Sequence, residues 1–266
     1  MSQALASIHP DAKIGQNVTI GAFTTIYGDV EIGEGTWIAN NVTIMDGARI
    51  GKNCRIFPGA VISAIPQDLK FRGEKTTAEV GDNTTVRECA TINRGTASKG
   101  KTVVGSNCLL MAYTHVAHDC ELKNYIILGN GTQLAGEVEI DDHAILSAHV
   151  LVHQFVRIGQ HVMISGGSHV LKDVPSFVKA AREPLCYMGL NVVGLRRRAF
   201  SPEKIQEIQT IYRHIYQSSM NNREAVSYIE TNMPSTPERD MIVEFVKTSK
   251  RGIMRGPNST AEPDEE

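Results

Sequence analysis

His118 and Asp119 are adjacent in the sequence, and their side chains are of the types used in general base catalysis. A solvent-facing histidine titrates near neutrality and can accept a proton from a hydroxyl group. A neighbouring carboxylate can orient the imidazole ring and stabilise its protonated form. Whether the pair can act in this way depends on which residues the fold places beside it.

The spacing of aliphatic residues predicts the fold that positions this pair. Isoleucine occupies position 8 and every sixth position up to 62, and aliphatic residues recur on the same period from 80 to 92 and from 104 to 170. A 3.6-residue helix cannot keep every sixth residue on one face, and an isolated strand would not need glycine so regularly. A coil with three six-residue sides explains both patterns, with the aliphatic residue pointing inward and a following glycine helping the chain turn the corner. The sequence therefore predicts a parallel β-helix of about eight stacked coils.

In such a coil, residues eighteen apart lie one above the other. His118, Gly136 and Gln154 then form one stack, and Asp119 lies under Glu137. A glycine on the coil next to the histidine leaves a backbone N–H free to approach a developing oxyanion. The stack thus places a candidate general base beside a candidate oxyanion donor, although a non-catalytic β-helical scaffold in which the histidine has no function remains an alternative. Other histidines have a plainer interpretation as solvated face residues of the coils: His143, His149 and His161.

The six-residue period is interrupted twice and then ends. Polar residues occupy the expected aliphatic positions at Asp68, Glu74 and Ser98, which predicts loops at 63–79 and 93–103. Helix starts follow at Ser201-Pro202, Asn222 and Thr236-Pro237. We therefore expect an all-β left-handed parallel β-helix over 1–186 with a C-terminal α-helical domain over 187–255, the left hand being implied by the resemblance described below. Residues 256–266 are polar and acidic, which predicts a disordered tail.

Composition excludes several other classes of protein. The formal net charge of the 266 residues is −2, so no global basic field favours nucleic acid. No stretch approaches the roughly 18–20 apolar residues that span a bilayer, and the N-terminus lacks the pattern of a signal peptide. The five cysteines include no CxxC pair, and three of them occupy the small inward positions of the repeat: Cys54, Cys108 and Cys120. The sequence predicts a cytoplasmic protein with no metal and no stable membrane insertion.

Four segments carry a resemblance to a known family. They are Pro66-Gln67-Asp68-Leu69-Lys70-Phe71-Arg72-Gly73-Glu74, His115-Val116-Ala117-His118-Asp119-Cys120, Val152-His153-Gln154-Phe155 and Gly194-Leu195-Arg196-Arg197-Arg198. In this order and on this repeat, they resemble the UDP-N-acetylglucosamine O-acyltransferases that begin lipid A synthesis. The resemblance implies a left-handed coil, a homotrimer, and transfer of a 3-hydroxyacyl chain from acyl carrier protein to the sugar 3-hydroxyl. It implies no cofactor, because the acyl chain arrives on the phosphopantetheine of acyl carrier protein.

The resemblance also implies a role for individual residues. His118 matches the general base, Asp119 its orienting carboxylate, and Gly136 the backbone donor to the oxyanion. Gly166 matches a residue that limits the length of the acyl chain, and its missing side chain predicts an open groove for about 14 carbons or more. The expected substrate contacts are Gln67, Asp68, Lys70, His115, Glu137, His153, Gln154, Asn191, Arg197 and Arg198.

Two residues differ from the pattern of this family, and two other families are alternatives. Glu137 stands where better-known members have a histidine, and Val193 replaces an acidic residue, so a 3-amino sugar acceptor remains an alternative. The later N-acyltransferase of the same pathway carries a uridine-binding domain before its repeats, whereas here the repeat already begins at Ile8. The gamma-class carbonic anhydrases bind zinc through three histidines on the same fold, but no stacked third ligand stands out here.

Overall fold

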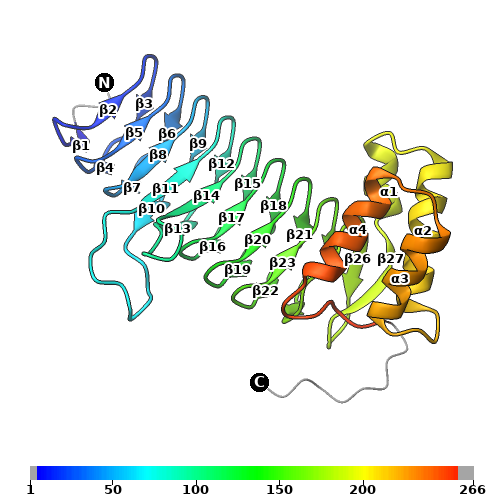
Figure 1. The fold of residues 1–266 in the computed structure, drawn as a ribbon. Helices are drawn as coiled ribbons and strands as arrows, with labels where there is room; N and C mark the ends of the chain where they lie inside the picture. The colour runs from blue at the N-terminus through cyan, green and yellow to red at the C-terminus, as the bar shows by residue number, and fades with distance from the viewer. Residues whose placement is uncertain (1–4, 257–266) are drawn as a thin grey trace.

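Short strands recur along the chain on the period seen in the sequence (Figure 1). The computed structural model describes residues 5–256, so the predicted tail lies, apart from Gly256, outside the described residues. The strands form three sheets in which each strand pairs in parallel with the strand one coil away, except for the antiparallel pair at the C-terminal end of the third sheet. This arrangement is a parallel β-helix, as predicted.

The first sheet contains β1 (Ser7–Ile8), β4 (Thr25–Ile26), β7 (Thr43–Ile44), β10 (Val61–Ala64), β13 (Thr91–Asn93), β16 (His115–Val116), β19 (Gln133–Leu134), β22 (Leu151–Val152) and β25 (His169–Val170). The second contains β2 (Lys13–Ile14), β5 (Glu31–Ile32), β8 (Ala48–Ile50), β11 (Thr77–Val80), β14 (Lys101–Val104), β17 (Glu121–Leu122), β20 (Glu139–Ile140) and β23 (Arg157–Ile158). The third contains β3 (Thr19–Ile20), β6 (Trp37–Ile38), β9 (Arg55–Ile56), β12 (Thr85–Val86), β15 (Leu109–Leu110), β18 (Ile127–Leu128), β21 (Ile145–Leu146), β24 (Met163–Ile164), β26 (Val178–Ala181) and β27 (Cys186–Leu190).

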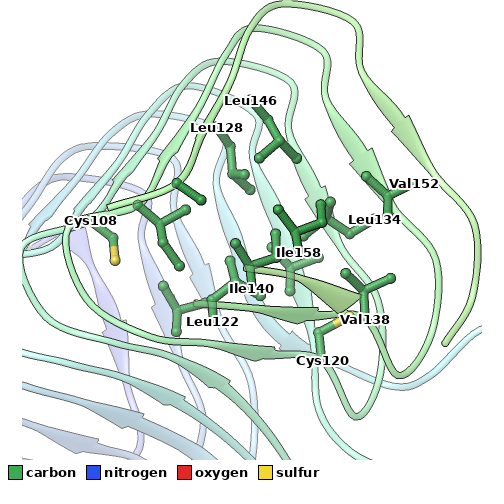
Figure 2. Packing of buried hydrophobic residues seen from close by; sticks show 14 of the residues in the cluster. Cys108, Cys120, Leu122, Leu128, Leu134, Val138, Ile140, Leu146, Val152 and Ile158 are labelled. Atoms are coloured by element: carbon green, nitrogen blue, oxygen red, sulfur yellow. The ribbon is translucent and has the colours of Figure 1, made fainter. Parts of the chain in front are cut away.

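The interior of the prism is aliphatic. Figure 2 shows the inward residues of successive coils meeting at its centre, with Cys108 and Cys120 among them. Cys54, Cys108 and Cys120 are all buried. Burial raises the pKa of the Cys108 thiol to about 11 and that of the Cys120 thiol to about 12. These thiols therefore behave as small buried hydrophobic groups, as predicted.

Glycine has a different task from the one expected. The glycines that follow the aliphatic positions do not have a left-handed backbone; instead, a Cβ on Gly33 would lie 2.5 Å from the Gly51 carbonyl carbon of the next coil. The left-handed residue is the third after the aliphatic position, for example Asn53 with φ 53° or Asp119 with φ 59°. The expectation that these glycines turn the corner was wrong, because they serve the close approach of neighbouring coils.

Two insertions leave the prism without disturbing its period. Val61 pairs with Thr91 thirty residues later, and Thr91 pairs with His115 twenty-four residues later, where an uninterrupted coil takes eighteen. The chain between β10 and β11 hangs from the side of the prism (Figure 1). The shorter insertion lies between β13 and β14. They add twelve and six residues, so the inward residues of later coils stay on the same six-residue numbering period.

Helices pack at the C-terminal end of the prism: α1 (Val192–Arg197), α2 (Pro202–Tyr216), α3 (Asn222–Asn232) and α4 (Pro237–Thr248) (Figure 1). The three longer helices begin at the predicted positions, capped by Ser201, Asn221 and Thr236. The buried Tyr212 hydroxyl donates to the Ser176 carbonyl at 2.6 Å, which ties α2 to the last turn of the prism.

Candidate active site

The corner between the first and second sheets, here called the first corner, carries His118, Gly136 and Gln154 on successive coils. The Glu137 N–H donates to the His118 carbonyl at 3.0 Å, and the Phe155 N–H donates to the Gly136 carbonyl at 3.2 Å. The predicted stack is therefore present. A Cβ on Gly136 would lie 2.6 Å from both Cε1 and Nε2 of His118, so the imidazole ring lies directly against this glycine.

His118 and Asp119 form a hydrogen-bonded pair at this corner. His118 Nδ1 lies 2.8 Å from Asp119 Oδ2; the histidine side chain is 20% exposed and the carboxylate is fully buried. An ionised carboxylate only accepts hydrogen bonds, so Nδ1 carries the hydrogen and Nε2 is left as the basic nitrogen. A ring held by a carboxylate with its other nitrogen open is the arrangement that a general base requires.

The inserted loop between β13 and β14 builds the surroundings of Asp119. Oδ1 accepts from the backbone N–H groups of Thr96, at 2.9 Å, and Lys99, at 3.2 Å. Oδ2 accepts from the Thr96 hydroxyl at 2.6 Å, and the Asp119 N–H donates to the Thr102 hydroxyl at 2.8 Å. Burial alone would raise the pKa of Asp119, but the hydrogen bonds from Thr96, His118 and Lys99 outweigh it and hold the pKa below its ordinary value. The carboxylate is thus ionised at neutral pH despite its burial.

The Gly136 amide is available to a ligand. Over residues 5–256, no protein acceptor lies in hydrogen-bonding position for its N–H. The amides of His118 and Gln154, directly below and above, also have no protein acceptor among the described residues, but these two residues carry side chains. Gly136 has none, so its N–H can approach a substrate oxygen closely.

Other predicted residues lie at or near the first corner. His115 in β16 contacts the Thr91 hydroxyl through Nδ1 at 2.7 Å, and burial, with the charge of His118, lowers its pKa. His153 is the residue before Gln154 in the chain, and its Nδ1 lies 3.1 Å from the Gln154 carbonyl oxygen. Glu137 accepts from the Ser98 hydroxyl at 3.1 Å.

The longer insertion carries the next group of predicted residues. Within it, the Lys70 N–H donates to the Asp68 carboxylate at 2.9 Å. The side chains of Gln67 and Lys70 are exposed, and Asp68 is half-buried.

The remaining predicted residues lie at different corners of the same chain. Asn191 caps α1 and donates to the His161 carbonyl at 2.9 Å, at the corner between the second and third sheets. Arg197 ends α1, and Arg198 follows it and donates to the Gly194 carbonyl at 3.3 Å. A Cβ on Gly166 would lie 2.9 Å from the Ala148 carbonyl oxygen, at the corner between the third and first sheets. One copy of the chain therefore does not bring these residues to His118.

The interpretation of His161 as a solvated face residue was wrong. Its ring is buried and stacks on His143, with ring centroids 4.9 Å apart, and on Phe177 at 5.7 Å. Burial, together with the charges of His143 and Arg198, lowers the pKa of His161 to about 4. Neutral at physiological pH, this ring packs as an aromatic side chain.

Sequence reasoning missed Thr96 and Thr102, which hold Asp119. The polar residue at Ser98 indicated a loop, but no spacing rule said which of its side chains would turn inward. Among residues 5–256, no three His, Cys, Asp or Glu side chains gather as a metal ion would require. None of the helices in this range is long and apolar enough to cross a bilayer.

Fold and site together define a class. A triangular β-helix with a histidine–carboxylate pair at a corner is typical of the hexapeptide-repeat acyltransferases, and the bacterial transferase hexapeptide profile matches residues 29–64. A second profile, described as Udp N-acetylglucosamine O-acyltransferase, Domain 2, matches residues 173–254.

Full-length relatives narrow the assignment further. An acyl-[acyl-carrier-protein]–UDP-N-acetylglucosamine O-acyltransferase of Alkalilimnicola ehrlichii is 46% identical over 251 residues, covering 94% of this chain and 97% of the relative. The crystal structure of LpxA, a UDP-N-acetylglucosamine acyltransferase from Bacteroides fragilis, is 54% identical with a TM-score of 0.94, covering 96% of this chain and all of that one. The Francisella novicida UDP-N-acetylglucosamine acyltransferase is 42% identical with a TM-score of 0.94, covering 97% and 95%. The chain belongs to the UDP-N-acetylglucosamine O-acyltransferase family.

Proposed function

We propose that the protein transfers a 3-hydroxyacyl chain from acyl carrier protein to the 3-hydroxyl of UDP-N-acetylglucosamine, the first step of lipid A biosynthesis. The observation that carries the proposal is the His118–Asp119 pair lying against the side-chain-free Gly136. Family membership supplies the two substrates. Five free cysteines among the described residues favour a reducing compartment, and we place the protein in the cytoplasm.

The geometry suggests the order of proton movements. His118 Nε2 accepts the proton of the sugar hydroxyl as its oxygen attacks the thioester carbonyl carbon. The Gly136 N–H donates a hydrogen bond to the carbonyl oxygen as it becomes negative. Collapse of the tetrahedral intermediate breaks the carbon–sulfur bond, and the proton on His118 passes to the departing thiolate. Asp119 stays ionised throughout and stabilises the imidazolium between the two transfers.

The test of this mechanism is His118→Ala. Loss of a general base typically lowers the rate by 10²–10⁴-fold, and we expect transfer in a purified assay to fall within that range while the fold persists. His9→Ala is the matched control, because His9 lies on the outermost part of the prism and its ring faces Gly28 much as His118 faces Gly136. Activity of the His118 variant within threefold of the parent would refute the assignment.

We further propose a homotrimer whose sites form between copies. The support is the separation of Asn191, Arg198 and Gly166 from His118 within one chain, which a second prism packed alongside would overcome. In this proposal Arg197 and Arg198 bind phosphate groups, for which guanidinium geometry is well suited.

Mixed oligomers test the shared site. If His118→Ala and Arg198→Ala chains are co-expressed, random assortment gives some sites with both residues intact, so about a quarter of parental activity should return. Recovery of no activity from folded mixed oligomers would mean that each site is built from one chain.

A 3-amino sugar is the second candidate acceptor. Glu137 places a carboxylate on the coil next to His118, and a carboxylate favours an ammonium neighbour. Rates measured with UDP-N-acetylglucosamine and its 3-amino analogue, for the parent and for Glu137→His, distinguish the two acceptors. A preference for the hydroxyl sugar in both proteins would remove the alternative.

A further inference from the structure

The loop between β13 and β14, residues 94–100, covers the buried side of Asp119. Thr96 is 6% exposed and contacts the carboxylate twice, through its N–H and through its hydroxyl. The loop is closed on itself by a hydrogen bond from the Gly100 N–H to the Thr96 carbonyl at 2.8 Å. It is also tied to the longer insertion, because the Thr76 hydroxyl donates to the Gly95 carbonyl at 2.6 Å.

The direction of the Thr96 hydroxyl is fixed by its neighbours. Its oxygen accepts from the Ser98 N–H at 3.1 Å, and its hydrogen is therefore available to Asp119 Oδ2 at 2.6 Å. This is the same carboxylate oxygen that faces His118 Nδ1 at 2.8 Å. Asp119 Oδ2 therefore faces two donors, the Thr96 hydroxyl and His118 Nδ1.

We propose that Thr96 is a positioning residue for the His118–Asp119 pair, and that its hydroxyl sets both the orientation of the carboxylate and the basicity of the histidine. Thr96 acts through Asp119 and has no assigned contact with substrate. The proposal rests on the proposed role of His118 as general base.

Removing the hydroxyl has a predictable electrostatic sign. The charged and titratable groups around His118 are Asp119 in its own corner, His115 in β16 and Glu137 on the next coil, with Lys99 in the loop paired to Glu139 at 3.0 Å. None of these replaces the donor that Oδ2 would lose. The oxygen would then hold more negative charge against the imidazolium, which favours the protonated ring. A histidine that is protonated more readily stops acting as a base at a higher pH when the pH is lowered.

Three variants test the proposal. Thr96→Val removes the hydroxyl at nearly constant shape, and Thr96→Ser keeps it. Thr76→Val is the matched control, because it removes a buried hydroxyl that also holds this loop but does not contact Asp119. We expect Thr96→Val to lower kcat about tenfold, less than the roughly 10²–10⁴-fold cost of losing the base. The acidic limb of its pH–rate profile should move to higher pH, while the profiles of the other two variants match the parent.

A second measurement does not depend on activity. Deuterium exchange at the imidazole C2 position of His118, followed by mass spectrometry over a pH series, should show the same upward shift in Thr96→Val, or in Thr96→Ala if the valine variant does not fold. Equal profiles for Thr96→Val and Thr76→Val would overturn the proposal and leave the loop a stabilising role only. If His118→Ala were itself active, the proposed function would fail instead, so the two failures are distinguishable.

Discussion

Gly136→Ala should strongly lower activity by displacing the proposed base, His118, although the backbone can accept alanine at this position. Gly136 does not have a left-handed φ, so the substitution adds no backbone strain. The new Cβ would lie 2.6 Å from Cε1 and Nε2 of His118. An ordinary carbon contact needs about 3.5 Å, so the ring would have to move by roughly 0.9 Å.

That displacement is large compared with the tolerance of the dyad. The Nδ1–Oδ2 distance is 2.8 Å, and a shift of this size away from the carboxylate would take it out of hydrogen-bonding range. Misplacing a catalytic group by about 1 Å can cost 10²-fold. We therefore expect kcat to fall about 100-fold with little change in KM for the nucleotide sugar, because the added methyl group displaces the proposed base.

The measurement is steady-state transfer by the purified variant, with circular dichroism to establish that the fold is intact. Gly28→Ala is the matched control: its Cβ would lie 3.0 Å from the Nδ1 atom of His9, in the same kind of corner but at the other end of the prism. It should retain parental kcat. A folded Gly136→Ala enzyme with kcat within threefold of the parent would show that His118 either relaxes freely or is not the base.

Three further predictions concern charge, chain length and pH. Arg197→Ala and Arg198→Ala should weaken binding of the carrier or of the nucleotide more than they lower the stability of the fold. For the parent, KM for acyl carrier protein should rise between low salt and about 0.5 M as screening increases. A KM independent of salt would argue against an electrostatic carrier site. Gly166→Met should shift the preferred acyl chain several carbons shorter, since each buried CH₂ contributes about 0.8 kcal/mol, with Gly166→Ala reporting the packing effect alone; an unchanged chain-length profile in folded Gly166→Met would remove this residue as the ruler. Because the pKa of Asp119 is lowered in the fold, its ionisation stabilises the protein above its unfolded-state pKa of about 3.8, and this stability is lost as pH falls through the folded value; Tm measured from pH 6 to 3 should therefore fall more steeply for the parent than for Asp119→Asn, and parallel curves would contradict this.

The repeat made much of the fold predictable from the sequence. An inward residue every six positions and three sides per coil determine which residues stack, so the contact between His118 and Gly136 followed from spacing alone. The same rule also separates residues: Gly166 lies eight hexads after His118, and eight is not a multiple of three, so the two cannot share a corner. Thr96 was out of reach, because an inserted loop follows no repeat and its conformation depends on contacts made only after folding.

The insertions explain how loops and a rigid site coexist. Each leaves the prism as a loop, and strand pairing resumes after it, so His118, Gly136 and Gln154 stack on the coils as if the loops were absent. The coils can therefore position the proposed base and the proposed amide donor through backbone register alone. The loops remain free to supply what the register cannot: Thr96, which holds the carboxylate from its buried side, and the exposed polar residues of the longer insertion.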